Sequence, residues 1–318
     1  MNFLAGLLAR ALDHLVITAL AFRGRDLLSD SDAAPSGQLA DRIQRWRGAS
    51  CELERIAEHG PQVDYRAHVH LDGARHELLF LHERVAHNGR LIVYHHGLAE
   101  RPPGGSYRYF LAHGSAALAA DRICLAGLGH VPGRRDLRRR LRRIEGFEEL
   151  IAASVVVAKT IADRFANQYP HRVLSGISLG GIVTLVESTF EPRFSANVAL
   201  LATPFLSRML LASSFTRLVH ARFRQRVSAT QLAPQVDVDR AVGRAGGSVV
   251  MVNGRNDTMV DIAALRAWWT TRPDVRRHEL NCSHFSVALA PRALRQTFLQ
   301  ALSDALSPAS IDAARRAE

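Results

Sequence analysis

The chain has 318 residues, with 41 Lys or Arg and 30 Asp or Glu, so its formal net charge is +11. Hydrophobic residues make up 47% of it, which excludes a disordered chain, and no apolar run approaches the ~20 residues of a membrane span. Aromatic residues make up 7%, and none interrupts the densest basic stretch, residues 134–143, so no nucleic-acid partner is expected.

Residues 1–61 are expected to form an N-terminal helix and a linker. Apolar residues recur on one face of an amphipathic helix at Leu4, Leu8, Leu12 and Leu15. This helix either packs on the domain or makes a peripheral contact with an anionic membrane. Because Asp13 and His14 interrupt the apolar run, it differs from a secretory signal. The polar residues 29–48 read as a linker or surface loop.

Regular structure is expected from Gln62 onward, where strand patterns alternate with helix patterns. Residues 62–71 and 75–82 predict an antiparallel pair joined at Asp72-Gly73, a strong hairpin signal. Further strands are expected at 90–96, 122–128, 172–176, 197–202, 248–254 and 275–280. Helices are expected at 146–166, 179–189, 262–271 and 291–306, with a helical insertion at about 204–245. This alternation predicts an α/β domain over 62–306, with a mostly parallel twisted sheet and helices on both faces, followed by a polar tail at 307–318.

The segment RVLSGISLGG carries the most informative motif. Its residues Gly176, Ser178 and Gly180 fit G-x-S-x-G between an apolar strand and a helix. Such a turn strains the serine backbone and needs glycines beside it, so that strand and helix can approach. It also places the serine at a helix N-terminus, where backbone N–H groups favour an oxyanion. The alternative is an ordinary glycine-rich turn that binds phosphate or nothing.

A serine nucleophile needs a histidine base and a carboxylate that orients it. Asp257 follows the strand at 248–254, and His284 follows the strand at 275–280. Loops at the carboxyl ends of parallel strands surround one crevice, so Ser178, Asp257 and His284 are expected to meet there. Asp261 is a rival for the acid, and His278 is a weaker rival for the base because it lies inside a strand.

A second oxyanion donor is expected after the strand at 90–96. There Gly97 would let the backbone turn inward, so that the N–H of Leu98 meets that of Leu179. Together these motifs resemble the α/β-hydrolase superfamily over about residues 62–306. The resemblance implies Ser178 as nucleophile, His284 as base and Asp257 as acid, and it implies that residues 204–245 correspond to a variable lid.

Within that superfamily, GISLGG, the arginine-rich stretch and the segment from DTMV to CSHFS resemble the group typified by α/β-hydrolase domain-containing protein 18. The expected function is a serine hydrolase that cleaves a carboxylic ester, with a small-molecule or lipid substrate. Acyl transfer or peptide hydrolysis at the same residues, and non-catalytic binding of an anionic partner, remain open. No cofactor is needed, and no carboxylate or cysteine completes a metal site with the neighbouring histidines.

Arginines supply almost all of the positive charge, since Lys159 is the only lysine. Four of them, Arg134, Arg135, Arg138 and Arg139, form a candidate anion-binding rim, because they follow the strand at 122–128. The alternative is a solvated basic face. The three cysteines are odd in number and widely spaced, which argues against a disulfide framework. The expected location is therefore the cytoplasm, either free or peripherally associated with a membrane.

Overall fold

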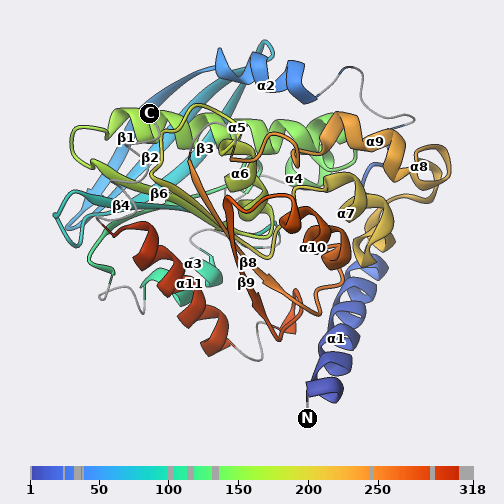
Figure 1. Cartoon of the computed structure of the whole chain (residues 1–318). Coiled ribbons are helices and arrows are strands. Elements are labelled where there is room, and N and C mark those ends of the chain that lie inside the picture. Colours follow the sequence, from blue (N-terminus) through green and yellow to red (C-terminus); the bar gives the residue numbers. More distant parts are fainter. Residues whose placement is uncertain are drawn as a thin grey trace.

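A computed structural model of the chain describes residues 2–23, 26–31, 37, 39–98, 100, 104–112, 118–130, 136–243, 247–286 and 291–307. Its strands are β1 (Ser50–His59), β2 (Gln62–Leu71), β3 (Ala74–Glu83), β4 (Arg90–His95), β5 (Asp121–Leu125), β6 (His171–Ile177), β7 (Ala196–Leu200), β8 (Ser248–Gly254) and β9 (Val275–Leu280). In the described part of the chain these strands form one sheet, ordered β1-β2-β3-β5-β4-β6-β7-β8-β9 (Figure 1).

The first three strands form an antiparallel extension of the sheet. β2 pairs with β3 from Gln62 opposite Glu83 to Leu71 opposite Ala74, as the sequence predicts. Asp72 and Gly73 both have positive φ, 48° and 78°, which the tight turn between the strands requires. β3 then pairs antiparallel with β5 and joins this extension to the rest of the sheet.

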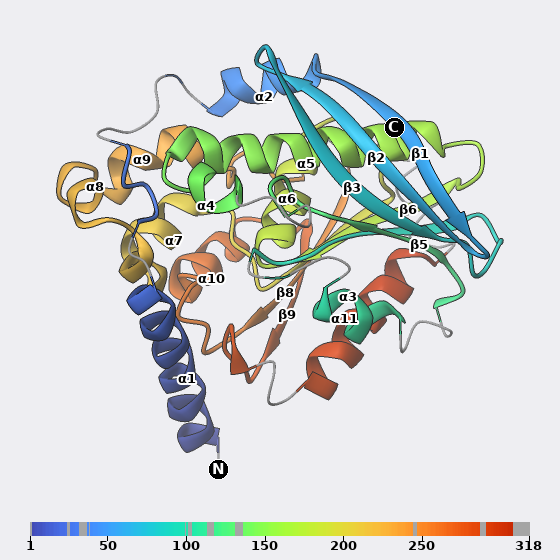
Figure 2. The ribbon, with the colours of Figure 1, turned by 180° about the vertical axis from the view of Figure 1, so that it is seen from behind.

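The other strands run parallel from β5 to β9, which confirms the predicted α/β class. Of these, β4, β5, β6, β7 and β8 are almost entirely buried, whereas the edge strand β9 is mostly not. One face is covered by α5 (Ile144–Arg164), α6 (Leu179–Glu187) and α10 (Ile262–Thr270). The opposite face is covered by α11 (Pro291–Ala305), the short α3 (Gly105–Tyr107) and the π-helical turn η1 (Arg108–Ala112) (Figure 2). Each predicted strand and helix in this part of the chain is present, with ends shifted by a few residues.

The predicted start of regular structure at Gln62 is wrong. β1 pairs antiparallel with β2, so the sheet begins at Ser50. The helix α2 (Leu39–Arg47) precedes it, within the segment expected to be a linker. Trp46 is buried, and the Arg42 guanidinium forms a buried ion pair with Glu148 of α5 at 2.7 Å. These contacts hold α2 on the body of the domain.

The expected N-terminal helix is present as α1 (Asn2–Arg23), but it packs through a different face from the one that its leucines form. Ala9, Asp13 and Ile17 are buried, whereas Leu4, Leu8 and Leu15 are about two-thirds exposed. Residues 4–22 have a mean hydropathy of 1.6, so α1 is long and apolar enough to cross a membrane by length and composition. The expectation that no segment reaches this length is therefore wrong.

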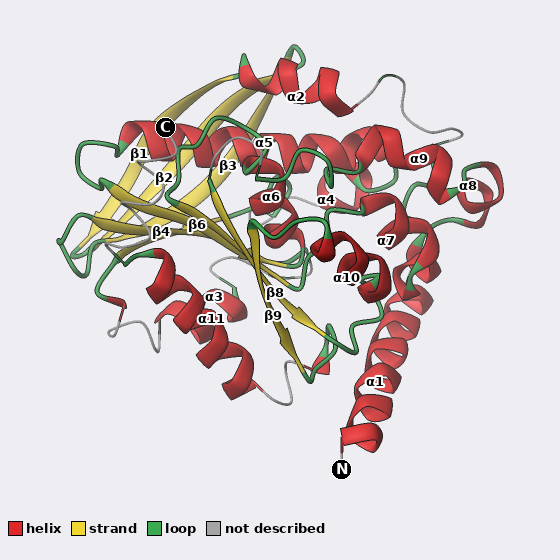
Figure 3. Ribbon diagram, viewed as in Figure 1, coloured by secondary structure: helices red, strands yellow, loops and turns green. Residues whose placement is uncertain are grey.

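The segment predicted as a helical insertion is helical over most of its described length (Figure 3). It contains α7 (Leu206–Ala212), the 3-10 turn η3 (Ser214–Leu218), α8 (Ala221–Arg226) and α9 (Ala229–Val236). The turn η3 lies beside α1, and Leu27 and Val219 form an isolated bridge next to it. The insertion and the N-terminal helix therefore flank the same end of the sheet.

Candidate active site

Ser178 lies on a strained turn between β6 and α6. Its φ of 55° and ψ of −112° fall where a residue with a side chain is rarely found. A Cβ atom at Gly180 would overlap the carbonyl oxygen of His95 in β4, and one at Gly176 would lie 2.7 Å from that oxygen. The glycines on both sides of Ser178 therefore allow the close approach of β4, β6 and α6 that the motif predicts.

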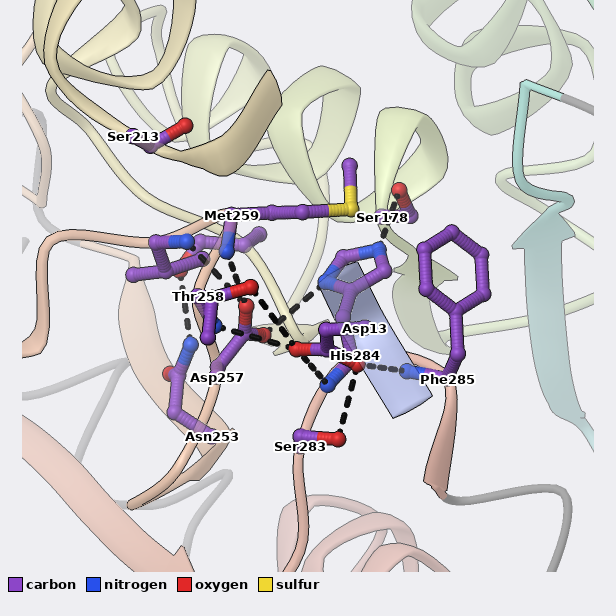
Figure 4. A network of polar contacts seen from close by, with 12 residues as sticks. Asp13, Ser178, Ser213, Asn253, Asp257, Thr258, Met259, Ser283, His284 and Phe285 are labelled. Carbon is purple, nitrogen blue, oxygen red and sulfur yellow. Dashed lines mark hydrogen bonds and ion pairs between the residues drawn. The ribbon is translucent and has the colours of Figure 1, made fainter. Parts of the chain in front are cut away.

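Ser178, His284 and Asp257 are joined by hydrogen bonds (Figure 4). Nε2 of His284 lies 3.0 Å from Oγ of Ser178, and Nδ1 lies 2.9 Å from Oδ2 of Asp257. Oδ1 of Asp257 accepts hydrogen bonds from the N–H groups of Met259 and Val260 at 2.8 and 3.1 Å. Because a carboxylate only accepts, Nδ1 of His284 carries a proton, and Nε2 is free to accept the serine proton.

The rival residues have other surroundings. Asp261 caps α10 by accepting from the N–H of Ala264 at 3.0 Å, and it pairs with Arg208 at 2.7 Å. His278 lies within β9. Burial raises the pKa of the Cys282 thiol to about 12, so this cysteine is protonated and unsuited to attack. Asp257 and His284, by contrast, take part in the row of hydrogen bonds that ends at Oγ of Ser178.

A cavity of about 580 Å³ opens beside Ser178 and His284. Most of its lining is apolar, including Phe147, Met209, Phe215 and Phe285. Leu98 and Leu179 line the same cavity, next to the serine. Leu179 is the first residue of α6, so its backbone N–H has no hydrogen-bond acceptor within the helix. The volume lies in the usual range for small-molecule sites.

Three side chains that the sequence interpretation left unassigned hold the turn at Gly97 and Leu98. Glu100 accepts from the N–H of Gly97 at 2.9 Å, and His130 donates from Nε2 to the carbonyl of Leu98 at 2.7 Å. His96 accepts from the N–H of Gly127 at Nε2, so its protonated Nδ1 donates to the carbonyl of Gly97 at 2.7 Å. These contacts fix the orientation of the peptide that carries the Leu98 N–H.

The residue that sequence reasoning missed most clearly is Asp13 of α1, which is fully buried. Its Oδ1 accepts from Oγ of Ser283 at 2.7 Å and from the N–H of Phe285 at 2.8 Å. Its Oδ2 accepts from the N–H of His284 at 3.2 Å, and from the N–H and Oγ1 of Thr258 at 3.1 and 3.2 Å. Asp13 thus ties the loop after β8 to the loop after β9 (Figure 4).

The pKa of His284 is raised above its ordinary value. Burial alone would lower this pKa, but the charge and hydrogen bond of Asp257 raise it, and the charge of Asp13 adds to this effect. The two carboxylates together outweigh the desolvation of the imidazolium. The environment therefore stabilises the positively charged form that His284 would take after accepting a proton.

The adjacent histidines His95 and His96 are both buried, and both are neutral. Burial lowers the pKa of His95 to about 4, and burial together with the charges of His95 and His130 holds the pKa of His96 well below its usual value. Nε2 of His95 lies 3.1 Å from Oγ of Ser154. Among the described residues, no group of three or more His, Cys, Asp or Glu side chains could hold a metal ion.

The arginine-rich stretch is largely paired with carboxylates. Arg138 pairs with Asp26 at 2.7 Å, and Arg139 pairs with Asp136 at 2.8 Å, both on the exposed surface. None of the residues that line the 580 Å³ cavity comes from the described part of this stretch, residues 136–143. Arg134 and Arg135 lie outside the described residues, so an anion-binding rim stays a prediction.

No family model matches the chain, and no curated protein matches it in sequence. Among solved structures, a cold-adapted esterase from an Arctic intertidal metagenomic library is similar with a TM-score of 0.55 at 13% identity, over 79% of this chain and 97% of that one. Acetyl xylan esterase 1 from Thermoanaerobacterium has a TM-score of 0.54 at 14% identity, over 87% and 97%. An acetyl xylan esterase from Paenibacillus has a TM-score of 0.53 at 14% identity, over 86% and 98%.

These likenesses show that the chain has the fold of these esterases. Membership of the α/β-hydrolase superfamily, which the motifs around Ser178 and His284 resemble, stays a prediction. The comparisons give no support to the closer resemblance to the domain-containing protein 18 group.

Proposed function

We propose that this protein is a serine hydrolase that cleaves carboxylic esters. The observation that carries the proposal is the hydrogen-bonded chain from Ser178 through His284 to Asp257 beside an apolar cavity. Solved esterases share the fold, which adds support. An apolar cavity of this size suits an acyl chain or another apolar ester group.

In the proposed reaction, Oγ of Ser178 attacks the ester carbonyl while Nε2 of His284 takes the serine proton. The backbone N–H groups of Leu98 and Leu179 stabilise the oxyanion. When the carbon–oxygen bond of the ester breaks, His284 returns the proton to the leaving alcohol and an acyl-enzyme remains. Water then attacks the acyl carbon, with His284 again accepting and returning a proton, and releases the carboxylic acid.

A fluorophosphonate probe tests the proposal directly, because it reacts with an activated serine by losing fluoride. We expect labelling of the folded protein and none of a Ser178→Ala variant. Labelling can be measured by intact mass and located by peptide mapping. A folded protein that the probe does not label would favour the non-catalytic alternative, and labelling at another serine would refute the assignment of Ser178.

Two finer assignments belong to the same proposal. The insertion at 204–245 would act as a lid, because Met209, Phe215 and Leu218 from it line the cavity. Hydrolysis is preferred to acyl transfer or peptide cleavage because the solved structures of similar fold are esterases. Incubation with esters in water, with esters plus an alcohol acceptor, and with peptides separates the three reactions, because their products are a free acid, a new ester and a cleaved peptide.

We expect Asp13→Asn to lower kcat/KM by about 10- to 100-fold, because a small displacement of the base costs about that much. The side-chain amide of this variant would point its N–H groups at no fewer than two of the N–H and O–H groups that donate to Asp13 in the parent protein, so these hydrogen bonds would be lost. It also removes a charge that raises the pKa of His284, so the acid limb of the kcat/KM profile should move to lower pH.

Asp30→Asn is a matched control, because Asp30 is itself exposed and pairs with the exposed Arg142. Thermal unfolding of both variants measures any loss of stability. An Asp13→Asn enzyme with lower stability but an unmoved acid limb would mean that Asp13 has no role in positioning or tuning His284.

A further inference from the structure

Helix α1 is apolar on two opposite faces, but only one of them packs on the protein. The packed face contains Ala9, Asp13, Ile17 and Ala21, which are all buried. On the opposite side, large apolar side chains have exposed fractions between 50% and 82%. We call this set the apolar ridge, and it consists of Leu4, Leu7, Leu8, Leu15 and Phe22. A helix that is apolar all round normally has a partner on each side.

The apolar ridge gathers most of the exposed large apolar side chains in the described part of the chain. Seven such side chains are exposed there, and five belong to the ridge. The other two, Ile56 of β1 and Val85 after β3, lie near the antiparallel end of the sheet, away from α1. A concentrated apolar patch of this kind marks a surface that contacts a partner or a membrane.

The position of Asp13 decides how α1 can meet a membrane. If α1 crossed a bilayer, the five hydrogen bonds from Thr258, Ser283, His284 and Phe285 would be lost, and the carboxylate would enter the hydrocarbon. Ile17 and Leu20 would also leave the wall of the cavity. A helix held on the protein by these contacts can still insert its outer face into the membrane interface.

We propose that the apolar ridge docks the protein on a lipid surface while α1 stays packed on the loops of the active site. The ridge is formed by a single helix and is therefore convex, which suits insertion among lipid headgroups. Arg10 and His14 are also exposed on α1, and the chain has a net charge of +11. Both features favour anionic lipids.

The same helix joins the lipid surface to the cavity. Ile17 and Leu20 form part of the cavity wall, so the ridge lies about one helix diameter, ~10 Å, from the space beside Ser178. This arrangement would take an apolar ester from the membrane interface into the cavity. The docking depends only on the surface of α1, whereas the choice of a lipid ester as substrate rests on the proposed function.

Vesicle co-sedimentation of the full chain tests the docking. We place Ser178→Ala in every sample, so that hydrolysis cannot alter the vesicles. The probes are vesicles of phosphatidylcholine alone and of phosphatidylcholine mixed with phosphatidylglycerol. A variant with Leu4, Leu8, Leu15 and Phe22 each changed to Ser should bind about 100-fold more weakly to the mixed vesicles. The control, Ile56→Ser with Val85→Ser, should bind like the parent.

The proposal expects parent binding that is stronger on mixed vesicles and that weakens with salt. It is overturned if the parent binds neither vesicle, or if the ridge variant binds as well as the parent. If alkaline carbonate failed to release the bound protein from the vesicles, α1 would span the bilayer and the proposal would be overturned. If the parent forms a dimer and binds no vesicle, and the ridge variant is a monomer, the ridge contacts a second copy of the chain and the proposal is overturned. Fluorophosphonate labelling of protein with Ser178 intact reports the hydrolase function separately.

Discussion

Replacement of Ser178 by Ala should reduce ester hydrolysis by about 10⁴-fold or more, down to the level that binding and the oxyanion donors alone supply. The reason is that Oγ of Ser178 lies 3.0 Å from Nε2 of His284 and carries the proton that this nitrogen would accept. The variant should keep its substrate affinity, because alanine leaves the cavity walls unchanged. Steady-state kinetics on a soluble ester measures kcat and KM separately.

Ser175→Ala is the matched control for this measurement. Ser175 is buried in β6, three residues before Ser178, and its Oγ makes a long contact of 3.5 Å with the carbonyl oxygen of Val93. Its removal should leave kcat within about twofold, because the lost contact is weak. If Ser178→Ala retained the parental rate while Ser175→Ala did not, the nucleophile would lie elsewhere and the proposed mechanism would be wrong.

The parallel part of the fold could be predicted because its strands and helices bury side chains in regular patterns. β1 was missed because it is an edge strand that is held mainly by backbone hydrogen bonds to β2. Its side chains, which include three glutamates, are mostly exposed. Only Cys51 and Leu53 alternate with polar residues before the register of its pairing with β2 shifts, so the apolar pattern is too short to mark a strand. Likewise, Arg42 of α2 is buried by its pairing with Glu148, a partner 106 residues away that no local pattern indicates.

The geometry at Ser178 could be anticipated because the glycines, strand and helix are local in sequence. The role of Asp13 could not, since its partners lie between 245 and 272 residues away. One signal was present: a single carboxylate inside an apolar helix must be exposed or paired, because an unpaired buried charge is costly. The same residue explains why the leucine face of α1 points outward. Its hydrogen bonds turn the helix so that Asp13, rather than Leu8 or Leu15, faces the protein.

Asp257→Asn should lower kcat by about 10⁴-fold while leaving the fold intact. The amide can donate to Nδ1 of His284, which would move the imidazole proton to Nε2 and leave no lone pair to accept the proton of Ser178. The substitution also removes the main cause of the raised pKa of His284, so any residual activity should show its acid limb at lower pH.

Asp261→Asn tests the alternative acid, because Asp261 is also a helix cap with an ion pair and follows the same strand. Because asparagine caps a helix about as well as aspartate, this variant should keep its cap, lose only the ion pair with Arg208, and leave kcat nearly unchanged. Both outcomes come from one set of pH-rate profiles and unfolding curves. If Asp261→Asn abolished turnover and Asp257→Asn did not, the carboxylate that orients His284 would have to be reassigned, although Ser178 and His284 could keep their roles.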